Sequence, residues 1–175
     1  MILPPLLRKL ALTVHVTASI GWIGAVAAFL ALAVAGLASH DAQLVRAAYL
    51  AMALTTWWVI VPLAGASLLS GVVSSLGTRW GLFRYWWVLV KLVLTVFATA
   101  VLMVHTRPID LLADAAADTA VFGADLHSAQ LQMVIASGAT LLLLLVLTAL
   151  SVYKPQGVTR YGWRKQQEQR ELLAP

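Results

Sequence analysis

The sequence predicts an all-α integral membrane protein, a four-helix bundle whose consecutive helices run up and down. The chain has 175 residues, of which 61% are hydrophobic and only 11% charged, whereas a water-soluble domain is about half apolar and a quarter charged. Its mean hydropathy is +0.87. Four apolar runs are each long enough to cross the hydrocarbon of a bilayer, which is about 30 Å thick and takes about 20 helical residues.

The four predicted spans are residues 10–38, 50–76, 85–105 and 127–153. The first run is too long for the apolar part of a signal peptide, so it is interpreted as a retained span. The connections 39–49 and 77–84 are short, which favours antiparallel neighbours. Residues 1–153 then form one transmembrane domain, and residues 154–175 form a basic tail.

The third connection, residues 106–126, is longer and acidic. Proline is favoured in the first turn of a helix, so Pro108 predicts a short surface helix in this connection. Its apolar residues Ile109, Leu112 and Ala116 are expected to rest on lipid headgroups. In the second span, Pro62 predicts a kink, and the pair Trp57 and Trp58 is typical of the membrane interface.

The distribution of basic residues orients the spans. Cytoplasmic connections carry an excess of lysine and arginine. Nine basic residues fall on one predicted side: Arg8, Lys9, Arg79, Arg84, Lys154, Arg160, Arg164, Lys165 and Arg170. Only Arg46 and Arg107 fall on the other side. Both termini are therefore predicted to be cytoplasmic. Because the bases flank apolar runs and form no patch, the pI near 10.0 does not indicate a protein that binds nucleic acid.

A lysine, Lys91, lies inside the third apolar run. A charged amine within a membrane span costs roughly 2.5–3.5 kcal/mol, so it normally has a partner or a task. The helical rise places Lys91 about 10 Å beyond Arg84, and His15 about 9 Å beyond Lys9. If Arg84 and Lys9 mark the same membrane face, Lys91 and His15 are predicted to lie at one depth in neighbouring antiparallel spans. This pair is the main candidate for a functional site.

Trp22 is a third candidate, because the seven residues from His15 return to almost the same helix face. A flat ligand beside His15 would be able to pack against its indole. Small residues in the second span let helices approach closely, or admit the face of a planar cofactor: Gly65, Ser67, Ser70, Gly71, Ser74 and Ser75. The structural alternative is that His15 hydrogen-bonds a neighbouring helix and Trp22 fills space.

The absent residue types exclude several functions. Without cysteine there is no disulfide, iron–sulfur cluster or thiolate metal site, so a metal or cofactor needs histidine, lysine, methionine or carboxylate ligands. The chain carries no phosphate-binding glycine loop and no nucleophile elbow, and it is short for an inverted-repeat transporter. Hydrolysis and ATP-driven transport are therefore not expected.

Two segments resemble a known superfamily: His15-Val-Thr-Ala-Ser-Ile-Gly-Trp22-Ile-Gly24 and Trp86-Trp87-Val-Leu-Val-Lys91-Leu92. The superfamily comprises the small bacterial membrane proteins with HemJ-type protoporphyrinogen oxidases and the CopD copper-resistance domain. The resemblance implies a multi-pass protein of a bacterial plasma membrane that holds haem b, with His15 and Lys91 as ligand candidates. The segment after Gly24 lacks the aromatic-leucine-proline-arginine element of the HemJ-type proteins, so the resemblance indicates the cofactor more than the reaction.

Three further histidines, His105, His127 and His40, each lie at the outer end of a predicted span. They are predicted to converge on the outer face. Neutral imidazoles in pairs are common ligands, so a second haem or a metal ion is one interpretation. The alternative is that the three side chains face water separately.

Three functions are compatible with these features. The first is a haem b protein for electron transfer or for oxidation of a membrane-soluble substrate such as a quinol or a porphyrinogen, with a redox partner protein. The second is a copper-handling or transport protein, and the third is a structural subunit of a larger membrane complex. Lysine favours haem over copper, because copper prefers methionine, histidine or thiolate ligands. A homo-oligomer is left open.

Overall fold

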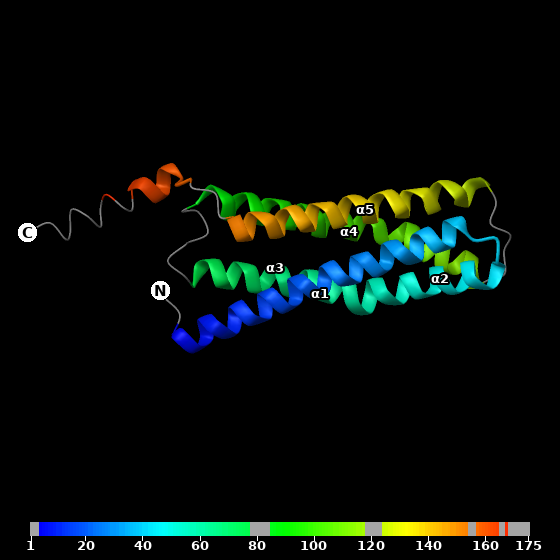
Figure 1. Ribbon diagram of the computed structural model, residues 1–175, viewed down its shortest axis with the longest axis horizontal. Helices are drawn as coiled ribbons and strands as arrows, with labels where there is room; N and C mark the ends of the chain where they lie inside the picture. The colour runs from blue at the N-terminus through cyan, green and yellow to red at the C-terminus, as the bar shows by residue number, and fades with distance from the viewer. Residues whose placement is uncertain (1–3, 78–84, 118–123, 154–156, 165–166, 168–175) are drawn as a thin grey trace, which may run out of the picture.

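The computed structural model describes residues 4–77, 85–117, 124–153, 157–164 and 167, and within them the protein is almost entirely helical. Its elements are α1 (Pro5–Ala38), α2 (Ala42–Thr55), the π-helical turn η1 (Thr56–Ile60), α3 (Val61–Leu76), α4 (Trp86–Ala117) and α5 (Ala124–Tyr153). Because α2, η1 and α3 are continuous, four long helices lie side by side (Figure 1). All four are long and apolar enough to cross a membrane, which confirms the predicted class of multi-pass helical protein.

The outer surface of the bundle is apolar along most of its length. Leu69, Val104 and Leu142, on three different helices, are each about two-thirds exposed. In water such a continuous apolar surface would drive association. In a bilayer it contacts lipid tails at no cost, so the surface agrees with the membrane assignment.

Helix packing places α1 and α4 at opposite corners of the bundle. α1 packs against α2, α3 and α5, and α4 packs against the same three helices. α1 and α4 make no extensive contact with each other. Residues on these two helices can therefore face one another only across the centre of the bundle.

The chain after α5 folds back onto the start of α4. Tyr85 forms a bridge with Val158, and the Trp86 N–H donates to the Gly157 carbonyl over 3.2 Å. Figure 1 shows α1 beginning at this same end. We call it the basic end, because its described cations are Arg8, Lys9, Arg160 and Arg164, and we call the opposite end the far end. Of the predicted tail, Gly157 and Val158 thus contact the start of α4; Lys154, Lys165 and Arg170 lie outside the described residues.

The second span carries a π-helical turn directly before Pro62. Proline has no backbone N–H, so the carbonyl of Trp58 loses the donor that a regular α-helix supplies four residues later. The Val61 N–H instead donates to the Thr56 carbonyl, five residues back, which is the hydrogen bond of a π-helix. Thr56 is fully buried as a result. The turn thus lies at the place where the sequence predicts a kink.

The predicted surface helix in the third connection is wrong. α4 continues to Ala117, and Pro108 lies inside it rather than at the start of a new helix. Ile109, Leu112 and Ala116 are buried in the core instead of resting on headgroups. The reason is that α4 packs along α2, whose buried Tyr49 and Met52 belong to the same core.

The first connection is also shorter than predicted. α2 begins at Ala42, so the turn between the first two helices is only residues 39–41. Asp41 caps α2 by accepting a hydrogen bond from the Gln43 N–H over 2.9 Å. The span from Ala42 to Leu76 has 35 residues, about 52 Å of helix, which exceeds the hydrocarbon thickness. Trp57 and Trp58 are exposed about 28 Å from Leu76, a spacing that fits the interfacial position predicted for them.

Candidate functional site

His15 is held on α1 by direct contacts with α3. Its Nδ1 lies 3.0 Å from the Ser67 carbonyl oxygen and 3.3 Å from the Ser70 Oγ. A carbonyl oxygen only accepts hydrogen bonds, so Nδ1 carries the hydrogen and donates it. In a neutral imidazole this leaves Nε2 with a free lone pair, and no hydrogen bond to Nε2 occurs among the described residues. This is the arrangement that metal-ligating histidines commonly show.

Small residues on α3 make this contact geometrically feasible. A Cβ atom on Gly71 would lie 3.0 Å from His15 Cε1 and 3.3 Å from its Nδ1, so the imidazole rests directly on the α3 backbone. Beside it, the Ser19 and Ser67 hydroxyls are 2.8 Å apart. The serine and glycine run of the second span therefore serves close packing of α1 on α3. Packing is one of the two roles expected for that run.

Lys91 reaches from α4 to α5 rather than to α1. Its half-buried Nζ donates to the Ser151 Oγ, and that hydroxyl donates in turn to the Leu147 carbonyl over 2.8 Å. The prediction of neighbouring antiparallel spans is wrong on both counts, because α1 and α4 are diagonal and begin at the same end, so they run parallel (Figure 1).

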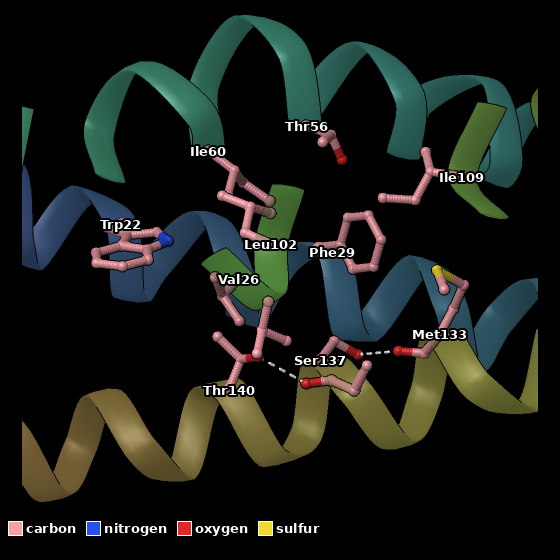
Figure 2. Close-up of a pocket in the computed structure, with 12 residues that line it drawn as sticks. Trp22, Val26, Phe29, Thr56, Ile60, Leu102, Ile109, Met133, Ser137 and Thr140 are labelled. Atoms are coloured by element: carbon pink, nitrogen blue, oxygen red, sulfur yellow. Dashed lines mark hydrogen bonds between the residues drawn. The ribbon is translucent and has the colours of Figure 1, made fainter. Parts of the chain in front are cut away.

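Trp22 lies about 10 Å further along α1 than His15, and it is 2% exposed. It lines an inner cavity of about 50 Å³ between α1, η1, α4 and α5. Figure 2 shows its indole beside Val26 and Leu102, with the nitrogen edge turned toward the cavity. The Nε1 hydrogen has no acceptor among the described residues. Trp22 is therefore a cavity residue whose polar atom is unused.

Three hydroxyl-bearing residues of this cavity, Thr56, Ser137 and Thr140, were not singled out by the sequence. Thr56 lines the cavity because it lies in the π-helical turn. Pro62 is the only nearby residue in the sequence that indicates such a turn. Ser137 and Thr140 belong to a span whose sequence is apolar on all faces, so no periodicity distinguishes its inward side. Only the packing of α5 against α1 and α4 identifies them.

The outer histidines are not brought into a described metal site. His40, in the turn after α1, and His127, in the first turn of α5, are both exposed. His105 belongs to α4, and its side chain lies outside the described part of the structure. Within the described residues, no three histidine, aspartate or glutamate side chains gather closely enough to hold a metal ion. A ligand set at the far end stays a prediction.

Comparisons with known protein families, with curated proteins and with solved structures find no match for this chain. The site is therefore defined by its own geometry. It offers one oriented imidazole, one amine across the bundle, and a separate cavity with an unused N–H donor.

Proposed function

We propose that this protein binds haem b within the membrane and works in electron transfer or in the oxidation of a membrane-soluble substrate. One observation carries the proposal: the Ser67 carbonyl fixes the His15 tautomer and leaves Nε2 as a lone-pair donor inside an apolar bundle. Neutral imidazole is the usual protein ligand of haem iron. The bound haem would supply one-electron redox chemistry, and the protein would tune it by ligand choice and burial.

The residues present fit such a group in their donor chemistry. His15 would hold the iron through Nε2, with its ring orientation set by Ser67 and Ser70. Lys91 would serve in one of two ways, as a neutral amine ligand or as an ammonium that pairs with a haem propionate. Its single described partner, the Ser151 hydroxyl, is neutral and readily exchanged. The apolar helices around the pair would exclude water from both residues.

An absorption spectrum of the protein purified in detergent tests this proposal. Wild type is expected to show a Soret band. His15→Ala should lower the haem content about tenfold or more, because losing an iron ligand costs more than losing a residue that only supports one. Lys91→Met should alter the spectrum or the reduction potential. Thr17→Ala, an exposed position two residues further on α1, is the matched control. Wild type without haem, or His15→Ala with full occupancy and an unchanged spectrum, would contradict the proposal.

The orientation that accompanies this function is an up-and-down bundle in a bacterial plasma membrane, with the basic end in the cytoplasm. Arg8, Lys9, Arg160 and Arg164 mark that end, and the positive-inside rule supports a cytoplasmic position for both termini. Alkaline phosphatase fused after Pro175 should be inactive, and the same reporter inserted at 118–123 should be active. A green fluorescent protein fusion should give the reciprocal pattern. An active phosphatase at the C-terminus would reverse the orientation.

A further inference from the structure

The inner cavity lined by Trp22 has an unusual balance of polar groups. The Trp22 N–H is a buried donor without an acceptor among the described residues. A buried donor without a partner is costly, and native structures rarely keep one without a reason. Figure 2 shows that the nitrogen faces into the cavity, toward Phe29 and Leu102. The cavity therefore presents a position at which an acceptor atom would be stabilised.

The cavity hydroxyls complement that donor. The Thr56 hydroxyl donates to the Met52 carbonyl over 2.8 Å, Ser137 donates to Met133 over 2.6 Å, and Thr140 donates to Ala136 over 2.7 Å. Because each hydroxyl hydrogen is used within its own helix, each oxygen can still accept a hydrogen bond. One unused donor and three acceptors thus surround the same small space.

A groove on the lipid-facing side adjoins this cavity. It lies between α4 and α5, has a volume of about 490 Å³, and shares Val101, Ala136 and Thr140 with the cavity lining. Its outer rim includes Phe97 and Ile135, which are about 60% exposed. Ligand sites typically have volumes of about 300–1,000 Å³, so the groove alone is large enough for a ligand body. The groove and the cavity therefore meet at Val101, Ala136 and Thr140.

We propose that the groove and cavity form a binding site for a membrane quinone and its quinol. One ring oxygen would accept from the Trp22 N–H, a quinol hydroxyl would donate to the oxygen of Thr140 or Ser137, and the apolar tail would occupy the groove. Among the described residues, no charged side chain lines either space, which disfavours fatty acids and phospholipid headgroups. A neutral, flat molecule with both acceptor and donor oxygens matches the lining. Binding stands on this geometry alone; its role as a substrate site rests on the proposed haem function.

Photo-cross-linking with an azido-decylbenzoquinone tests the site, with unlabelled decylubiquinone as competitor and decylbenzene as a competitor without oxygens. In detergent-purified wild type, competed cross-links should map to residues 97–101 and 131–143 of α4 and α5. Trp22→Phe keeps an aromatic ring but removes the N–H, so the half-maximal competing concentration should rise about three- to tenfold. Ala136→Phe should remove the competed cross-links by filling the shared wall. Ala149→Phe, at an exposed position of the same helix, should leave them unchanged.

Each alternative result overturns the quinone assignment. Cross-links spread evenly over the lipid-facing surface, equal competition by decylbenzene, or displacement by oleate or a sterol but not by decylubiquinone would each do so. An unchanged competition curve in Trp22→Phe, with thermal stability kept, would exclude the proposed hydrogen bond. Repeating the experiment on His15→Ala separates the two proposals. If the His15→Ala variant lacks haem but still shows competed cross-links, the quinone site is supported independently of haem. If wild-type protein contains haem but shows no competed cross-links, only the quinone site is refuted.

Discussion

Replacing Gly71 with valine is expected to lower the haem content of the purified protein about tenfold to hundredfold, the usual cost of losing a residue that supports a metal ligand. A Cβ at this position would lie 3.0 Å from His15 Cε1 and 3.3 Å from Nδ1, and the two valine methyls would come closer still. The imidazole would have to turn away from the Ser67 carbonyl. With Nδ1 released, neither the tautomer nor the direction of Nε2 would be fixed.

Gly65→Val is the matched control for this prediction. Gly65 lies on the same helix, α3, and a Cβ added there meets nothing within 4 Å. Both variants change helix propensity alike, so they differ mainly in the contact with His15. Haem per protein, read from the Soret band, and thermal stability should be measured for both. Equal haem content in the two variants would show that the α3 contact does not position His15.

The class of fold was predictable from the sequence because the bilayer imposes it. Backbone groups within hydrocarbon must satisfy their hydrogen bonds internally, so four long apolar runs have to be helices. The extent of the helices was not predictable in the same way. Beyond the membrane, the packing of side chains determines where a helix ends. α4 continues through Pro108 because Ile109 and Leu112 pack in the core with the buried face of α2. Pro108 alone indicates a helix start, and the tertiary contacts override that local signal.

The angular arrangement of the candidate site was not predictable from the sequence. Counting residues from the basic flanks predicts one depth for His15 and Lys91. Which helices are neighbours depends on side-chain packing around the bundle axis, and loop length gives only a preference. The sequence therefore missed that Lys91 turns to Ser151. The sequence also missed the Trp22 cavity. Whether the Trp22 N–H has an acceptor depends on which atoms of other helices lie beside it, and the sequence does not show this.

Replacing Gly36 with valine is expected to produce the largest loss of stability of any single substitution considered. A Cβ on Gly36 would lie 2.8 Å from Tyr49 Cζ and 2.9 Å from its hydroxyl oxygen. Tyr49 is fully buried within the hydrophobic core, so the ring cannot swing aside without displacing the side chains packed around it. Overpacking of this kind costs about 1–3 kcal/mol.

Thermal unfolding in detergent, followed by circular dichroism, measures this effect. Gly24→Val on the same helix is the control, because a Cβ on Gly24 meets nothing within 4 Å. The midpoint of Gly36→Val should fall well below that of Gly24→Val. Adding Tyr49→Ala creates space for the new methyls, so the double variant should lose less stability than the two single losses added together. Strict additivity, or equal midpoints for the two valine variants, would mean that α1 and α2 do not pack through Gly36 and Tyr49 in the folded protein.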